Sequence, residues 1–178
     1  MKTKRLVMNA MLIAMCAVLG YVAIDLTTIK LTFESVPVLI AALLFGPVDG
    51  LAVGALGTFI YQMLRYGFSA TTFLWILPHA LFGLVVGIYA KKSGFKLGRM
   101  ETAILILLSE LMITVLNSGV IYADSKIYGY YFEGIVLGSL LVRLISCVAK
   151  SIIFALVVPM LVNILKKTFG QELRDAKA

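Results

Sequence analysis

Charge is scarce in this sequence. Only 14% of the 178 residues are charged, whereas 61% are hydrophobic. A soluble globular domain carries about 25% charged residues, so the composition excludes that class and indicates an integral membrane protein. The net charge of +7 therefore predicts no nucleic-acid partner, and the placement of the basic residues reports membrane topology instead.

Residues that could ligate a metal or act in catalysis are also few. The two cysteines, Cys16 and Cys147, lie inside apolar runs, and His79 is the single histidine, so we expect no disulfide framework, no metal site and no cofactor. The sequence has no Gly-x-x-x-x-Gly-Lys-Ser/Thr loop for ATP and no His-Glu-x-x-His motif. An enzyme would be left with Glu110, His79 and Asp49, and we expect no enzyme.

What the sequence does contain is six apolar segments, separated by polar connections and by breakers such as Gly46-Pro47. They predict an all-α membrane protein with six transmembrane helices in one bundle, a single domain over 1–178. The expected spans are 6–24, 35–45, 51–64, 71–90, 100–123 and 134–165. The second is short for a hydrocarbon core of about 30 Å. The connection 25–34 is expected to be a loop or a short hairpin, and Asp49-Gly50 the turn before the third helix.

With six spans, both termini share one side of the membrane. We place both termini in the cytoplasm, because most basic residues outside the spans then face inward, as the positive-inside rule requires. The inner residues are Lys2, Lys4, Arg5, Lys91, Lys92, Lys96, Arg99, Lys166, Lys167, Arg174 and Lys177. The outer side receives Lys30, Arg65 and Lys126.

Polar residues recur at matching depths in the last two spans. Arg143 and Lys150 are seven residues apart, which places them about 20° apart on one helical face, and Glu110 and Asn117 have the same spacing. In antiparallel helices Glu110 would lie level with Lys150, and Asn117 with Arg143. Each ionisable residue at a span centre costs about 2.5–3.5 kcal/mol, so Arg143 and Lys150 need partners, water or a ligand.

Two interpretations of this polar seam stay open. Glu110 and Lys150 form either a structural ion pair or the proton or ion path of a stand-alone secondary transporter or channel. Arg143 has no evident acid at its own level, so it is satisfied either by backbone carbonyls and water or by an acidic or carbonyl-bearing ligand.

The third and fourth segments supply a candidate pocket near the outer face, with Tyr61 and Gln62 at the depth of Trp75. The only tryptophan, Trp75, is either an interfacial anchor or a stacking wall for an aromatic ligand. His79, one turn deeper, either hydrogen-bonds a ligand or satisfies backbone freed by Pro78.

Small residues form stripes on three segments. Ala10 and Ala14, with Ala17 one turn on, let another helix approach closely, either within the bundle or from a partner. The stripes of the third and fourth segments predict tight internal packing: Gly50, Gly54, Gly57, Ala80, Gly83 and Gly87.

The stretch from Phe33-Glu-Ser-Val-Pro37 to Leu44-Phe-Gly-Pro47-Val-Asp-Gly50 resembles a motif of the substrate-binding S components of energy-coupling factor (ECF) vitamin transporters. It is most similar to the folate-specific branch, and size and span count agree over essentially the whole chain. The resemblance implies a multi-pass protein of a prokaryotic cell membrane. It also implies that two separate cytoplasmic ATPases hydrolyse ATP, while the loaded subunit topples in the membrane and releases its vitamin inward.

The resemblance also implies roles for particular residues. Ala10 and Ala14 would dock on the membrane coupling subunit. The vitamin would lie near the outer face, under a lid formed by Lys30–Glu34. Its expected contacts are Trp75, His79, Asn117 and Arg143.

Folate fits this set chemically. Trp75 could stack on the flat pterin, Asn117 and Gln62 can donate and accept together, and Arg143 could meet the ring carbonyl. The carboxylates of the glutamate tail would meet Arg65, Lys30 or Lys126. Other flat, polar vitamins satisfy much of the same list.

Overall fold

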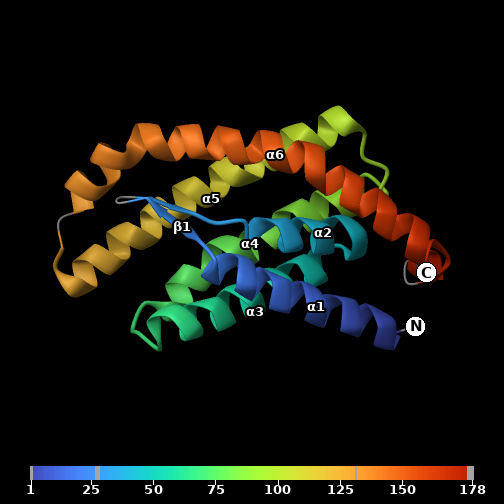
Figure 1. Ribbon diagram of the computed structural model, residues 1–178, viewed down its shortest axis with the longest axis horizontal. Helices are drawn as coiled ribbons and strands as arrows, with labels where there is room; N and C mark the ends of the chain where they lie inside the picture. Colours follow the sequence, from blue (N-terminus) through green and yellow to red (C-terminus); the bar gives the residue numbers. More distant parts are fainter. Residues whose placement is uncertain (1, 27–28, 131, 176–178) are drawn as a thin grey trace.

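The computed structural model describes residues 2–26, 29–130 and 132–175, with side chains over 3–23, 32–130 and 142–168. This part of the chain folds into six helices and one short hairpin (Figure 1). The helices are α1 Lys2–Tyr21, α2 Ser35–Phe45, α3 Pro47–Tyr66, α4 Thr72–Lys92, α5 Arg99–Tyr128 and α6 Phe132–Asp175. The predicted six-helix architecture is confirmed.

The connection between α1 and α2 is a hairpin rather than a plain loop. Strands β1 Ile24–Leu26 and β2 Ile29–Leu31 pair antiparallel, with Asp25 opposite Lys30. The sequence analysis left both conformations open, and the structure selects the hairpin.

The short helix α2 forms the centre of the molecule. It has no polar face and is buried against α1, α3, α4 and α6, as expected for a helix that is apolar all round. Its 11 residues give a length of about 16 Å at 1.5 Å per residue, so α2 alone does not cross a bilayer. Four described stretches are long and apolar enough to do so: Thr3–Tyr21, Thr72–Lys92, Arg99–Tyr128 and Val142–Thr168.

Several helix ends differ from the prediction. α3 begins at Pro47 rather than at 51, so Asp49 and Gly50 lie in its first turn instead of forming a separate turn. Proline suits the first helical position, and a carboxylate in the first turn complements the helix dipole. α5 passes the predicted end at 123 and stops where Gly129 adopts a φ of 73°. Similarly, α6 continues past 165 to its end at 175.

α3 and α4 pack backbone against backbone, as their glycine stripes predict. A Cβ atom on Gly54 would lie 2.3 Å from the carbonyl oxygen of His79, and one on Gly83 would lie 2.1 Å from that of Gly50. Only hydrogen fits at these distances. This close approach holds the first half of α3 against the middle of α4.

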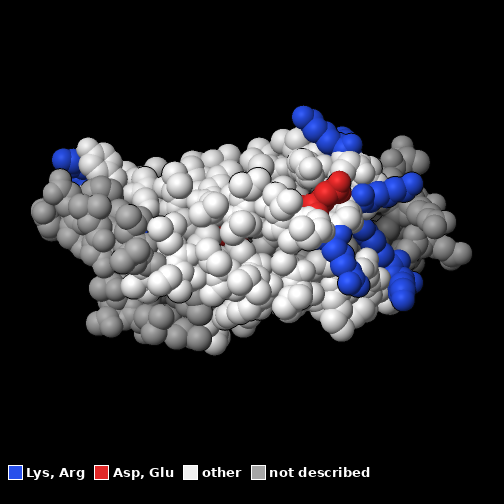
Figure 2. Space-filling model, turned by 90° about the horizontal axis from the view of Figure 1, so that it is seen from above, with Lys and Arg blue, Asp and Glu red and all other residues white. Residues whose placement is uncertain are grey.

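The N-terminal end of α1 and the C-terminal end of α6 lie at the same end of the molecule, whereas the hairpin lies toward the opposite end (Figure 1). We call these the basic end and the hairpin end, because Lys and Arg gather where the termini lie (Figure 2). The exposed residues of the basic end are Lys4, Lys91, Lys92, Lys96, Arg99 and Lys167. This distribution fits the cytoplasmic side, which stays a prediction.

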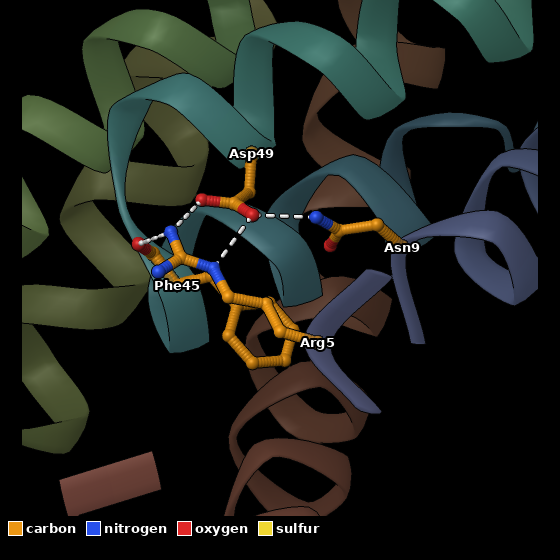
Figure 3. A network of polar contacts seen from close by, with 4 residues as sticks. All are labelled: Arg5, Asn9, Phe45 and Asp49. Carbon is orange, nitrogen blue, oxygen red and sulfur yellow. Dashed lines mark hydrogen bonds and ion pairs between the residues drawn. The ribbon is translucent and has the colours of Figure 1, made fainter. Parts of the chain in front are cut away.

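A buried carboxylate ties helices together at the basic end. Asp49, 6% exposed, accepts hydrogen bonds from Arg5 Nε at 3.0 Å, from Arg5 Nη2 and from Asn9 Nδ2 (Figure 3). Arg5 Nη2 also donates to the Phe45 carbonyl oxygen at 3.2 Å. α1 is therefore fixed to the junction between α2 and α3.

Candidate functional site

A cavity of about 520 Å³ lies at the hairpin end, between α3, α4, α5 and α6. Small-molecule sites commonly measure roughly 300–1,000 Å³, so this volume suits a ligand of vitamin size. All six residues predicted for the site line the cavity: Tyr61, Gln62, Trp75, His79, Asn117 and Arg143. The structure thus brings together side chains of four helices, and their role in binding stays a prediction.

One wall of the cavity comes from α4. Trp75 and His79 are four residues apart and therefore share a helical face, and both line the cavity. Trp75 is half-buried, whereas His79 is only 5% exposed. α4 remains one continuous helix through the buried Pro78. An indole placed in this way suits stacking on a flat ligand.

Glu34 contributes to the cavity from the junction between the hairpin and α2. It directly precedes α2, is 5% exposed and lines the cavity. Its Oε1 accepts a hydrogen bond from Thr32 Oγ1 at 3.1 Å and lies 3.3 Å from His79 Nε2. Its Oε2 has no hydrogen-bond partner among the side chains that the structure describes. A buried carboxylate thus presents one satisfied and one unsatisfied oxygen.

The opposite wall comes from α5 and α6. Lys150 Nζ lies 2.8 Å from Oε2 of Glu110, whose side chain is fully buried. The contact is an ion pair outside hydrogen-bond geometry, since neither Glu110 oxygen has a hydrogen-bond partner within the described part of the chain. It confirms the predicted match in depth between these two residues. The pair neutralises both charges, which favours the structural interpretation of the seam.

Comparison with known proteins identifies the family. The family model described as "ECF-type riboflavin transporter, S component" matches residues 1–167. The chain belongs to this family. A solved S component of a bacterial ECF transporter is also similar, with 24% sequence identity, a TM-score of 0.66, and coverage of 93% of this chain and 99% of the other. Its likeness shows the shared fold. A search of curated protein sequences finds no match.

Family membership gives the chain its general role. It is an integral membrane S component, the substrate-binding subunit of an ECF importer, and the family is a transporter component rather than an enzyme class. This membership favours the subunit over a stand-alone secondary transporter or channel that uses Glu110 and Lys150.

Within the S component, Arg143 lines the cavity and is half-buried, and it already interacts with another group of the protein. A guanidinium has five N–H donors, so this interaction leaves both interpretations of Arg143 open, and its contact with a ligand stays a prediction. A bond to a ligand now rests on the position of Arg143 beside Asn117 in the cavity lining.

At the mouth of the cavity, Asp124 of α5 already has a hydrogen-bond donor. Tyr130 Oη donates to Asp124 Oδ2 at 2.8 Å and also approaches the Ile121 carbonyl oxygen at 3.2 Å. Burial, followed by the hydrogen bond to Asp124, raises the pKa of Tyr130 to about 12. This contact holds Tyr130, which follows α5, against the last turns of that helix.

The basic residues predicted to meet a carboxylate tail are placed differently. Arg65 Nη1 donates to the Tyr21 carbonyl oxygen at 2.9 Å, and Lys126 Nζ lies 5.5 Å from the centre of the Tyr122 ring. Neither Arg65 nor Lys126 lines the cavity. The side chain of Lys30 lies outside the described residues, so only the Thr32 and Glu34 part of the predicted lid is seen to line the cavity.

The three alanines of the α1 stripe differ in exposure. Ala10 and Ala14 are exposed, whereas Ala17 is buried. Apolar neighbours on α1 are also exposed, including Leu6, Met11 and Val18. The exposed pair is therefore open to a partner, and the docking role stays a prediction.

Sequence reasoning missed two groups. It assigned Glu34 to a lid and not to a pair with His79, and it treated Arg5 as a topology signal and not as the partner of Asp49. The available signal was chemical, since Glu34 directly precedes the wholly apolar α2 and Asp49 lies four residues after it, and a carboxylate that is buried with such a helix needs a partner.

Proposed function

We propose that this S component binds a flat heterocyclic vitamin in the cavity at the hairpin end, with folate as the expected cargo. The carrying observation is the cavity of about 520 Å³ with Trp75 on one side and Asn117 and Arg143 on the other. A ring stacked on the indole would present its polar edge to an amide and a guanidinium. Both groups suit a heterocycle that carries amino and carbonyl functions.

Riboflavin is the second candidate, and the family description supports it. Its ring is equally flat, so stacking on Trp75 would not distinguish the two vitamins. They differ in charge and in the polar ring edge. Folate carries two carboxylates, whereas riboflavin is neutral.

Delivery to the cytoplasm would require partner subunits. In this proposal Ala10 and Ala14 dock on the membrane coupling subunit, and two cytoplasmic ATPases supply the energy, with the hairpin end facing the exterior of a prokaryotic cell. The support is the exposure of both alanines on a helix that is otherwise held by its buried face.

The lone tryptophan provides the test. Purified protein is titrated with folate, riboflavin, thiamine, biotin and pantothenate while tryptophan emission is followed, with inner-filter correction and calorimetry as an independent measurement. Saturable binding of folate at submicromolar concentration supports the proposal. Tight binding of riboflavin alone would make riboflavin, and not folate, the substrate. If no vitamin binds tightly, the binding function is refuted.

A site variant accompanies the titration. Arg143→Ala should weaken binding of the vitamin by about 2 kcal/mol if the guanidinium donates a charge-assisted hydrogen bond. Arg65→Ala is the matched control, because Arg65 does not line the cavity and its loss should leave affinity unchanged. Equal affinity of a folded Arg143→Ala variant would assign Arg143 to structure alone.

A further inference from the structure

Buried polar atoms without partners gather on one part of the cavity lining. Among the residues whose side chains the structure describes, Glu34 Oε2, Thr58 Oγ1 and His79 Nδ1 meet no hydrogen-bond partner, and all three residues line the cavity. Their exposures are 5%, 1% and 5%. Buried polar atoms nearly always have partners in native proteins. Three such atoms on residues that line one cavity favour a ligand whose edge completes them once the side chains turn toward it.

The hydrogen-bond network defines what that edge must offer. Glu34 Oε1 lies 3.3 Å from His79 Nε2, so the tautomer with the proton on Nε2 satisfies this contact and leaves Nδ1 as an acceptor. Glu34 Oε2 is an acceptor as well, and the Thr58 hydroxyl can act in either sense. The free atoms therefore call mainly for N–H donors.

Glu34 is held firmly in its place. Cys16 Sγ of α1 donates to the Glu34 carbonyl oxygen at 3.4 Å, and a Cβ on Gly20 would lie 2.7 Å from Glu34 Oε2. The carboxylate thus packs against the backbone of α1 at a position where only glycine fits. A fixed acceptor selects among ligands better than a mobile one.

A metal ion is not the expected occupant. The described residues contain no group of three or more His, Cys, Asp or Glu side chains that could hold one. An organic edge with N–H donors remains as the ligand class.

We propose that Glu34, with His79 oriented beside it, selects a substrate ring with two adjacent N–H donors, the 2-amino-4-oxopyrimidine edge. This inference rests on the proposed vitamin-binding function and deepens it. Such an edge presents an amino group next to a ring N–H, both directed at carboxylate and imidazole acceptors. A 2,4-dioxo edge places a carbonyl on each side of its single N–H, so its oxygens would face Glu34 without donors. Pterins have the first edge, and flavins have the second.

Pterin and lumazine provide a closely related pair of probes, because lumazine has a carbonyl in place of the 2-amino group of pterin, with N1 protonated as a consequence. Each compound is used to displace the vitamin that binds in the titration above. Wild-type protein should bind pterin at least about tenfold more tightly than lumazine, since a polar mismatch at a buried acceptor is strongly rejected. Glu34→Gln, whose amide can turn either its oxygen or its NH₂ to the ligand, should bring the ratio close to one.

Asp124→Asn is the control variant, because Asp124 lines the same cavity but already accepts a hydrogen bond from Tyr130. This variant should keep the wild-type ratio of pterin affinity to lumazine affinity. If the wild-type protein binds pterin and lumazine equally well, or prefers lumazine, then Glu34 does not select the ring edge. The vitamin-binding function would be unaffected by that result. This comparison needs no variant to fold. Failure of every vitamin to bind would instead refute the proposed function itself.

Discussion

Two buried carboxylates lie at opposite ends of α2 and have opposite surroundings. Asp49, at the basic end, is 6% exposed and has both oxygens hydrogen-bonded by Arg5 and Asn9. Glu34, at the hairpin end, is 5% exposed, and one of its oxygens meets no partner among the described residues. Burial alone therefore does not distinguish the two acids. Their saturation by the protein does, and our proposal assigns the incomplete acid beside the cavity to the ligand.

α1 contacts both carboxylates and so connects the two ends. Arg5 and Asn9 reach Asp49, while Cys16 and Gly20 pack against Glu34. The exposed face of the same helix carries Ala10 and Ala14. A change on that face should consequently leave both ends intact, which separates docking from folding and from binding.

The largest expected effect concerns this exposed face. Ala14→Arg should leave vitamin affinity in detergent unchanged and abolish uptake in cells, because a long charged side chain prevents close approach of a partner helix. Uptake of the bound vitamin and affinity of purified protein are measured side by side. Val115→Arg is the control, since Val115 is 70% exposed on α5 and imposes a similar cost of inserting arginine into the membrane. If cells with Ala14→Arg and cells with Val115→Arg take up the vitamin equally well, Ala14 has no docking role.

The ion pair of Glu110 and Lys150 extends the comparison to a third carboxylate. Lys150→Met should destabilise the protein by about 3–5 kcal/mol, because it leaves a fully buried charge without a partner. The double variant Glu110→Gln/Lys150→Met should recover most of that loss. Unfolding in detergent gives both values. A Lys150→Met variant as stable as wild type would show that Glu110 is neutral or reaches water.

The two acids at the ends of α2 can be compared by the same isosteric change. Asp49→Asn should cost about 2 kcal/mol, because Arg5 loses a charged acceptor. Glu34→Gln should change stability by less than about 1 kcal/mol, since Oε2 gives up no partner. Denaturation midpoints of both variants, measured without vitamin, test the difference. Equal losses would mean that Glu34 is as structural as Asp49.

The helices were largely predictable because apolar runs and breakers are local signals. The predicted segment 35–45 coincides with α2, which ends where Gly46-Pro47 stops it. The end of α5 was predicted too early, because the polar residues after 123 were taken as a loop although Gly129 supplies the helix end. The pairing of Glu110 with Lys150 followed from depth alone, since both lie on long regular helices.

The saturation of each polar group was not predictable. Arg5 and Asp49 are 44 residues apart in sequence, and their contact depends on how α1 crosses the junction of α2 and α3. The same limit explains why two interpretations of Arg143 stayed open and why the contact between Glu34 and His79 was not predicted. Sequence patterns give the depth and face of a side chain, whereas its hydrogen-bond partners depend on tertiary packing.

The smallest expected effect concerns Asp124. It is intermediate between Asp49 and Glu34, because it lines the cavity, as Glu34 does, and yet has a hydrogen-bond donor in Tyr130. Tyr130→Phe should cost about 1 kcal/mol at neutral pH, the usual value of one hydrogen bond. The pKa of Tyr130 is raised to about 12 from an ordinary value of about 10. The folded state therefore favours the protonated phenol, and its contribution is complete below pH 10 and lost as the pH rises toward 12.

The alkaline range thus provides a second measurement of the same contact. Wild-type stability should fall between pH 10 and pH 12 by more than that of Tyr130→Phe, so the two proteins should converge at high pH. Tyr128→Phe is the matched control, because Tyr128 also lines the cavity but is exposed. If Tyr130→Phe shows the same alkaline loss as wild type, Asp124 does not depend on Tyr130. Asp124 would then belong with Glu34 as an acceptor available to the ligand. The cavity would hold two incomplete acids, and only Asp49 of the three would be saturated by the protein.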